Sequence, residues 1–352
     1  SILDKDAVLQ LAQELNIDGI LSFGVDPGVV TAAYVAEKMG LSFQCSYDAA
    51  CILQDKSRFR QFLKDNNFNV PNAKGYSSKE EALADTAYYN WPVIVKPVDS
   101  AGSKGVTRVD ELGQLSSAID YALSESHNGH FIIEDFLEKE GNSSDCESFT
   151  VDGKLVFCSF NDQHFDSQAL NPYTPAAFSW PSTMPQWAQE ELMSELQRLM
   201  TLLNVKTGVY NIETRLCKNG KPYIMELAPR GGGNRLSEMM KYISGQDLID
   251  NCVRAAVGDS IDEIHQPVYE GYWVEIILHS ERDGVFRSIE IDKTVEERFL
   301  IEKDIWVKAG DKVQGFTGAN TTIGTLVLRF DTNEEMTCCL SNQERWLKII
   351  VL

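Results

Sequence analysis

The chain has 352 residues, 43% of them hydrophobic and 24% charged, which is the composition of a folded globular protein with two or three domains. Its formal net charge of −20 argues against nucleic-acid or anionic-lipid partners, because both need clustered lysine and arginine. No apolar run reaches the roughly 18 residues of a membrane span, and no signal peptide is evident, so we expect a cytoplasmic protein without a membrane partner.

The N-terminal segment reads as part of an α/β unit. We expect a helix over residues 4–15, a buried strand over 19–23, and a turn and helix over 24–39. About 55 residues cannot close the core of a doubly wound sheet, so either more chain precedes Ser1 or this piece packs against later domains. The turn at residues 24–28 could hold a phosphate at the following helix, but a simple strand-to-helix turn is the favoured interpretation.

Two lysines follow, at the start of a helix and at the end of a strand. Asp55 is expected to cap an amphipathic helix that begins at Lys56 and ends near Asn67. The β-rich run 91–97 carries Lys96 near its end and leads into a loop of small residues.

This loop, residues 99–106, is a candidate phosphate site. Its glycines let backbone amides close around phosphate oxygens, and two serines and a lysine add donors. A flexible surface hairpin is the alternative. The donors and glycines in question are Ser100, Gly102, Ser103, Lys104 and Gly105.

The middle of the chain alternates strand signals with one helix. Residues 131–137 form an apolar strand that ends in two acids, and strand signals continue through 147–160 with a turn at Asp152-Gly153. Residues 162–185 contain four prolines and several aromatic residues, and we interpret them as a loop that contacts substrate, or else as a surface excursion. Residues 190–203 have the apolar spacing of a helix.

An acidic hairpin over residues 209–230 is the most informative segment. Asn219-Gly220 between two apolar runs predicts a two-residue turn, which would pair Lys218 with Lys221. Counting outward, Glu213 then faces Glu226. Cross-strand neighbours lie about 5 Å apart, and two carboxylates that close repel each other unless a cation lies between them. A solvated hairpin neutralised by nearby lysine or arginine is the alternative.

The hairpin leads into the sequence Arg230-Gly-Gly-Gly-Asn-Arg235 ahead of a helix. Two arginines and bare backbone amides at a helix start make an anion site, and we expect Arg235 with Gly232 and Gly233 to bind a substrate carboxylate. From Gly271 onward the pattern is mostly β, with strand runs 273–279 and 285–291 joined by Asp283-Gly284.

In this order, the motifs resemble the ATP-grasp superfamily, and within it the carboxylate-amine ligases such as L-amino acid ligases and relatives of the carbamoyl phosphate synthase large subunit. The resemblance is carried by four motifs: Asp55-Lys56, Pro92-Val-Ile-Val-Lys-Pro97 with its loop, Ile133-Glu-Asp-Phe-Leu137, and Glu213 followed by Glu226-Leu-Ala-Pro-Arg230. It implies an α+β ATP-grasp fold in the broader α/β class.

The resemblance implies three units. Residues 1–70 would be a partial pre-ATP-grasp α/β domain with a linker helix. Residues 71–264 would be the ATP-grasp domain, with a lid over about 71–135 and a metal-binding part over about 136–264. Residues 265–352 would be a β-rich C-terminal subdomain.

It also implies site residues and cofactors. ATP would lie between two antiparallel sheets, with Lys56 and Lys96 near the phosphates and the adenine edge. The loop from Ser100 to Gly105 would close over the phosphates. Mg²⁺, or Mn²⁺ in its place, would lie at Glu213 and Glu226, and Arg230 would stabilise the transferring group. The adenine would meet Glu134, Asp135, Phe136 and Leu137. Catalytic roles fall to Arg230, Lys96 and Glu226.

Two departures from the family pattern concern the metal and the ribose. Many members have Asn two residues after the second acid, where this chain has Ala228, so we expect Asn211 on the facing strand, or water, to complete the metal shell. The usual ribose glutamate is missing from residues 141–144, which leaves Glu138, Glu140 and Glu147 as alternatives.

The expected activity is an ATP- and Mg²⁺-dependent ligation of a small-molecule carboxylate to an amine through an acyl phosphate, with an amino acid among the candidate substrates. A carboxyphosphate-forming enzyme and a catalytically degenerate ATP-binding module are the alternatives. The general base for the amine and a homodimeric state are left open.

Overall fold

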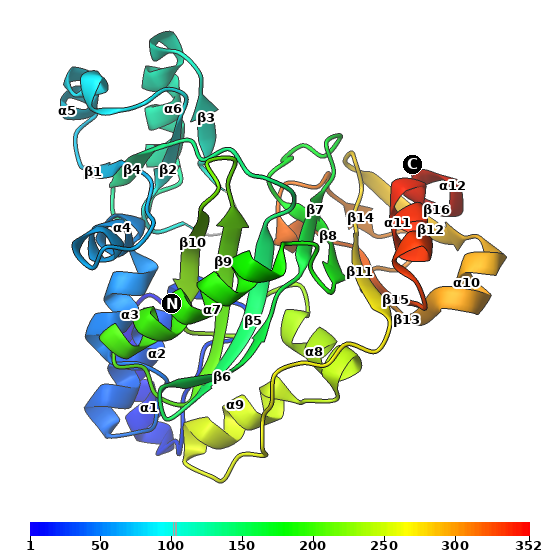
Figure 1. Cartoon of the computed structure of the whole chain (residues 1–352), viewed down its shortest axis with the longest axis horizontal. Helices are drawn as coiled ribbons and strands as arrows, with labels where there is room; N and C mark the ends of the chain where they lie inside the picture. Colours follow the sequence, from blue (N-terminus) through cyan, green and yellow to red (C-terminus); the bar gives the residue numbers. More distant parts are fainter. Residues whose placement is uncertain (101, 103) are drawn as a thin grey trace.

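The structure is a computed structural model of the chain that describes residues 1–100, 102 and 104–352. Helices and strands alternate along the described chain, and the strands form four antiparallel sheets (Figure 1). This confirms the expected mixed fold. Among the described residues, no helix combines the length and the apolar character that a membrane crossing requires.

The N-terminal segment consists of helices. They are α1 (Lys5–Leu15), α2 (Asp26–Met39) and α3 (Tyr47–Gln54), the last of which we did not predict. The strand expected over 19–23 is wrong: the segment makes a single parallel bridge, between Phe23 and Gly231. An apolar run forms a strand only when a neighbouring strand satisfies its backbone groups, and the described chain offers it none beyond that bridge.

The upper lobe of Figure 1 is a four-stranded sheet in the order β1-β4-β2-β3, packed against α5 and α6. Helix α4, whose first-turn amides of Ser57 and Arg58 are capped by the Asp55 side chain as predicted, links this lobe to the N-terminal helices. The elements are α4 (Lys56–Asp65), β1 (Ala73–Tyr76), α5 (Lys79–Ala84), η1 (Thr86–Tyr88), β2 (Val93–Pro97), β3 (Thr107–Val109), α6 (Leu112–Ser124) and β4 (Phe131–Asp135).

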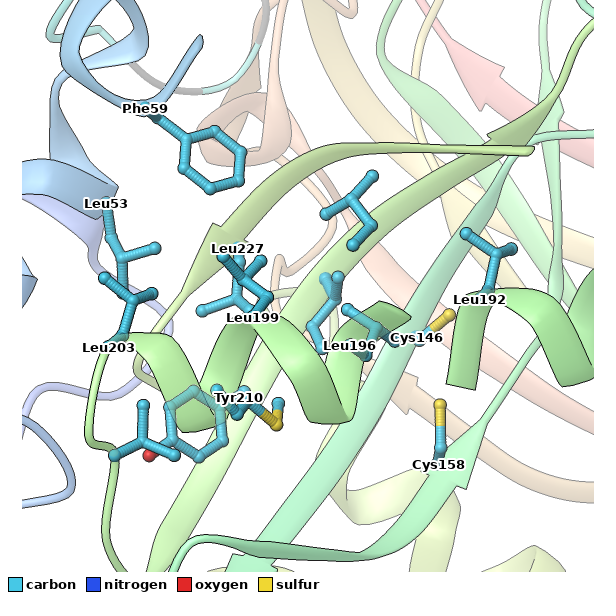
Figure 2. Close-up of a cluster of buried hydrophobic side chains, with 14 of the residues drawn as sticks. Leu53, Phe59, Cys146, Cys158, Leu192, Leu196, Leu199, Leu203, Tyr210 and Leu227 are labelled. Atoms are coloured by element: carbon cyan, nitrogen blue, oxygen red, sulfur yellow. The ribbon is translucent and has the colours of Figure 1, made fainter. Parts of the chain in front are cut away.

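The central sheet has the order β10-β9-β5-β6, and helices cover both of its faces. Leucines of α7 pack with Tyr210 of β9 and with α3 and α4 on one face (Figure 2). The adjacent Val209 faces the other way, toward α8 and α9. The elements are β5 (Ser144–Val151), β6 (Lys154–Ser159), α7 (Gln186–Leu202), β9 (Gly208–Leu216), β10 (Pro222–Ala228), α8 (Leu236–Ser244) and α9 (Leu248–Val257).

The prediction of a loop over residues 162–185 is wrong. The segment contains a hairpin of β7 (Asp162–Phe165) and β8 (Pro175–Trp180). These strands complete a five-stranded sheet, β13-β15-β11-β8-β7, together with strands from the C-terminal portion. Its prolines concealed the strand pattern, but Pro175 begins its strand, a position where proline is tolerated. The partners are β11 (Tyr272–Leu278), β13 (Leu300–Ile305) and β15 (Gly324–Phe330).

The strands expected over 273–279 and 285–291 are both present, but they lie in different sheets. Strand β12 leaves β11 and pairs with β14 and β16 in a separate three-stranded sheet. The C-terminal portion is rich in strands as expected, and it also contains helices. The remaining elements are β12 (Gly284–Ile291), α10 (Lys293–Phe299), β14 (Lys312–Val313), η2 (Ala319–Thr321), α11 (Asn333–Ser341), α12 (Gln343–Trp346) and β16 (Leu347–Val351).

A carboxyl group without a partner is buried in the five-stranded sheet. Glu275 of β11 lies between Phe178 and Val327 and is fully buried, and neither of its side-chain oxygens has a hydrogen-bond partner among the described residues. Burial, which outweighs the attraction of Arg235, raises the pKa of Glu275 well above its usual value. The folded protein therefore keeps this carboxyl protonated under conditions where the unfolded chain ionises it.

We expect Glu275→Gln to stabilise the fold by an amount that increases with pH. Between about pH 4.3 and the raised pKa of the folded state, the unfolded wild-type chain loses this proton while the folded one keeps it. Over that range the wild type loses about 1.4 kcal/mol of stability per pH unit that the amide variant does not lose. Denaturant unfolding from about pH 5 to about pH 8 measures the gap. Glu290→Gln, an exposed change on β12, is the matched control; a gap for Glu275→Gln that stays constant with pH would contradict the assignment.

Candidate active site

The acidic hairpin has the predicted facing residues, although its turn differs. Cys217, and not Lys218, lies opposite Lys221 next to the turn. An irregularity between Ile224 and Glu226 shifts the register by one, so that Glu226 does pair with Glu213, and Ala228 with Asn211. The bulge thus restores on β10 the facing carboxylates that the simple count predicted.

A cavity of about 680 Å³ lies where the upper lobe, the central sheet, the N-terminal turn and the C-terminal portion meet. Most of the predicted site residues line it. These are Lys56, Lys96, Ser100, Gly102, Lys104, Glu134, Asp135, Phe136, Leu137, Asn211, Glu213, Glu226, Arg230 and Gly233. Of the other predicted residues, Gly105, Glu147, Gly232 and Arg235 do not line the cavity, and Ser103 lies outside the described residues.

Glu147, which we expected at the cofactor, contacts the glycine loop and does not line the cavity. It is 1% exposed and accepts hydrogen bonds from the Gly232 amide at 2.7 Å and from the Ser237 hydroxyl. A further donor is the Asn211 amide nitrogen at 3.2 Å. Burial is the largest cause that raises the pKa of Glu147, to about 7. Its oxygens are therefore engaged with the protein behind the cavity wall, away from a ribose.

Arg235 likewise does not line the cavity. Its guanidinium contacts Glu238 at 2.8 Å, Glu302 at 2.6 Å and the Thr325 hydroxyl at 2.9 Å. The residue therefore ties the start of α8 to strands β13 and β15. The structure thus gives these partners to the residue that we expected to bind a substrate carboxylate.

Lys96 and Glu134 form a buried cluster with Arg60, a residue that sequence reasoning missed. Glu134 accepts from Lys96 at 2.5 Å and from Arg60 at 3.0 Å, while Arg60 also donates to the Met225 carbonyl of β10 at 2.7 Å. Burial alone would raise the pKa of Glu134, but the two cations lower it to about 2. The Glu134 carboxylate is thus committed to this cluster, and adenine contacts would have to come from other atoms of residues 134–137.

Lys56 connects the candidate phosphate site of residues 99–106, which we call the phosphate-type loop, to the acidic hairpin. Its ammonium donates to the Ser100 carbonyl at 2.9 Å and lies 3.8 Å from the Glu226 carboxylate. Burial by itself would raise the pKa of Glu226, but Lys56, Lys96 and Arg230 outweigh it, so the pKa lies below its usual value. Glu226 is therefore held as an anion in the cavity.

A third acid extends the carboxylate row. Asp145 of β5 pairs with Glu213 across the sheet, so that acids from three neighbouring strands lie side by side, and Asp145 lines the cavity. Burial is the largest cause that raises the pKa of Asp145, to about 7, against the attraction of Arg230. The Asn211 amide nitrogen donates to Asp145 at 2.7 Å.

Arg230 is the buried cation at the end of this row. It donates to Asp26 at 2.7 Å, to the Asn211 side-chain oxygen at 3.1 Å and to the Gly231 carbonyl at 2.9 Å. Burial would lower the pKa of Arg230, but Asp26 and the nearby Asp145 raise it. The Asn211 oxygen already accepts from Arg230, so metal ligation by Asn211 would use the second lone pair of that oxygen.

The magnesium expectation can be tested against these groups. Within the described part of the chain, no three His, Cys, Asp or Glu side chains gather as a metal-binding cluster. Two facing carboxylates nevertheless suit Mg²⁺, which uses few protein ligands and takes the rest from water and phosphate oxygens. Glu213 and Glu226 fit that demand, although the guanidinium of Arg215, 3.0 Å from Glu213, partly neutralises one of them.

Three residues of the site, Arg60, Asp145 and Asp26, were not predicted. The positions of the first two in the sequence could have indicated them. Arg60 lies one turn along the helix that Lys56 begins, on its buried side, and Asp145 precedes Glu147 by two residues on the same strand. Asp26 lies in the turn for which we considered a phosphate, and its own carboxylate there disfavours that anion. No local pattern joins Asp26 to Arg230, 204 residues away.

The cavity thus brings together two largely buried lysines, Lys56 and Lys96, described residues of the 99–106 loop, and the facing carboxylates. Residues 89–238 match the family model of the ATP-grasp domain, so this segment of the chain is an ATP-grasp domain and the expected resemblance is confirmed.

The relatives are distant. The C-terminal section of the carbamoyl phosphate synthase large chain from Aquifex aeolicus is 26% identical over 218 residues, covering 62% of this chain and 39% of its own length. The chain thus spans less than two fifths of that relative.

Two solved structures show the same fold. The L-amino acid ligase from Bacillus licheniformis has a TM-score of 0.81 at 20% identity, covering 99% of this chain and 84% of its own. The biotin carboxylase domain of 2-oxoglutarate carboxylase from Hydrogenobacter thermophilus, solved with MgADP and bicarbonate, has a TM-score of 0.74 at 16% identity, covering 99% and 78%.

Proposed function

We propose that this protein is an ATP- and Mg²⁺-dependent ligase that joins a carboxylate to an amine through an acyl phosphate. The observation that carries the proposal is the single cavity that collects Lys56, Lys96, the facing Glu213 and Glu226, and Arg230. Phosphoryl transfer asks a protein mainly for positioning and charge neutralisation, and these residue types provide both. The ATP-grasp domain match supports ATP as the phosphoryl donor.

The reaction divides into two balanced steps. A carboxylate oxygen bonds to the γ-phosphorus as the bond to ADP breaks, and the amine nitrogen then bonds to the acyl carbon as inorganic phosphate leaves and a proton is released. Lys56, Lys96 and the amides of the phosphate-type loop would hold the ATP phosphates. Arg230 would contact the carboxylate and then the acyl phosphate.

Glu213 and Glu226 would hold Mg²⁺, and water would fill the coordination position for which Ala228 has no side-chain ligand. When bound, Mg²⁺ supplies charge neutralisation at the phosphate oxygens. The solved relative with MgADP supports this cofactor pair. A cytoplasmic location and a homodimer stay predictions.

Phosphate release on mixing the protein with ATP, Mg²⁺ and a panel of acids and amines tests this function. Release that needs both an acid and an amine is the expected result. Release with bicarbonate alone would indicate a carboxyphosphate-forming enzyme. ATP binding without turnover across the panel would indicate a degenerate binding module, which the Ala228 substitution and the engaged Asn211 oxygen keep as the second candidate.

A further inference from the structure

A carboxylate from the N-terminal turn reaches the cavity beside Arg230. Asp26 is the first residue of α2, and its Oδ1 accepts from Nε of Arg230 and lies near Nη2, both at 2.7 Å. Only about a tenth of either side chain is exposed, and both line the cavity. No described residue donates to Oδ2 of Asp26. The pair thus presents one cationic and one anionic group side by side at the cavity wall.

Several wall segments beside this pair carry no other charged residue, although Asp145 of β5 also lines the cavity and attracts Arg230. We call this region the acceptor end and define it by four segments, residues 24–27, 173–175, 230–234 and 318–320, all of whose residues except 231 and 232 line the cavity. Within these segments Asp26 and Arg230 are the only charged residues. The backbone keeps the first and third segments together, because the Gly24 amide donates to the Gly231 carbonyl at 3.1 Å.

A region with one ion pair and no surplus cation is selective. A phosphorylated substrate would bring extra negative charge to a region whose only described cation is already balanced by Asp26, and unpaired charge in a desolvated site is costly. A zwitterion carries an adjoining ammonium and carboxylate, and it matches the pair group for group, with its carboxylate at Arg230 and its ammonium at the open oxygen of Asp26.

We propose that Asp26 is a specificity-determining residue that selects an unphosphorylated α-amino acid as the acid to be activated. The inference rests on the proposed function, in which Arg230 meets the carboxylate. Asp26 holds the α-amino group as an ammonium, and a protonated nitrogen has no lone pair with which to attack the acyl phosphate. The enzyme thereby keeps the activated amino acid from serving as the amine as well.

Two measurements test this. The first is kcat/KM for α-amino acids against their des-amino and N-acetylated counterparts with one fixed amine. The second is calorimetric binding of the same acids in the presence of Mg²⁺ and a non-hydrolysable ATP analogue. The wild type should prefer the free α-amino acids in both. In Asp26→Asn the preference ratio should fall at least about tenfold, which is the range expected for one charge-assisted hydrogen bond.

The controls separate recognition from structure. Asp48→Asn, an exposed acid in the first turn of α3, should leave the ratio unchanged, and Asp26→Glu should restore part of it. If Asp26 had a purely structural role, its replacement would lower kcat/KM equally for both kinds of acid and leave the ratio unchanged. That result would overturn the inference.

Failure of the inference and failure of the ligase function are distinguishable. Turnover with no preference for the α-amino group would refute the role of Asp26 and leave the ligase standing. Amino-acid binding that needs Asp26, without turnover, would refute the ligase and leave Asp26 standing. Neither binding nor turnover of any α-amino acid overturns both.

Discussion

Arg230→Ala should lower kcat/KM by about 10³ or more, with most of the loss in kcat, because this guanidinium would meet the charge that develops during phosphoryl and acyl transfer. Arg230→Lys should recover only a small part, since an ammonium cannot make the forked contacts to Asp26 and Asn211 that orient the guanidinium. Steady-state phosphate release measures both variants.

The fold needs a separate check for this residue. Removing Arg230 leaves Asp26 buried without a partner, which itself costs stability. The double variant Asp26→Asn with Arg230→Met removes both charges, and it should unfold closer to the wild-type temperature while staying inactive. The exposed Arg287→Ala is the matched control and should keep full activity. Wild-type kcat in a folded Arg230→Ala would remove Arg230 from the mechanism.

Glu226→Gln should lower kcat by about 10² or more. It should also raise the Mg²⁺ concentration needed for half-maximal activity. The amide keeps the shape of the side chain but removes a negative charge that would bind the metal and that now lies 3.8 Å from the Lys56 ammonium. Titration of Mg²⁺ at saturating ATP separates a metal defect from a loss of nucleotide binding.

The expected structural cost of this change is small, because 36% of the Glu226 side chain is exposed. Circular dichroism and thermal unfolding should therefore match the wild type. Glu191→Gln, an exposed acid on α7, is the charge-matched control and should leave the Mg²⁺ dependence unaltered. If Glu226→Gln shows the wild-type Mg²⁺ dependence and rate, the metal lies elsewhere.

Local patterns predicted much of the site. Asp55-Lys56, the run to Lys96, and the alternation on either side of Asn219-Gly220 are short-range signals, and each produced the helix start or strand that it indicated. The facing of Glu213 and Glu226 was correct although the turn was displaced, since the bulge on β10 compensates for it. Backbone preference and side-chain alternation are properties of a few adjacent residues and can be read from them.

The errors lie where distant segments meet. Residues 162–185 became strands because β11 offers them a partner almost 100 residues later, and residues 19–23 did not because they have none beyond one bridge. Arginine is a residue type typical of anion sites, yet Arg235 forms ion pairs with Glu302 and Glu238.

The amino-acid order alone thus indicated an ATP-grasp domain, two lysines, facing carboxylates and the arginine that follows them. The three-dimensional arrangement added Arg60, Asp145 and Asp26, and it removed Glu147 and Arg235 from the cavity. The reason is that a hydrogen bond or ion pair depends on which side chains the folded chain brings within about 3 Å, and no local periodicity specifies contacts between residues tens to hundreds of positions apart.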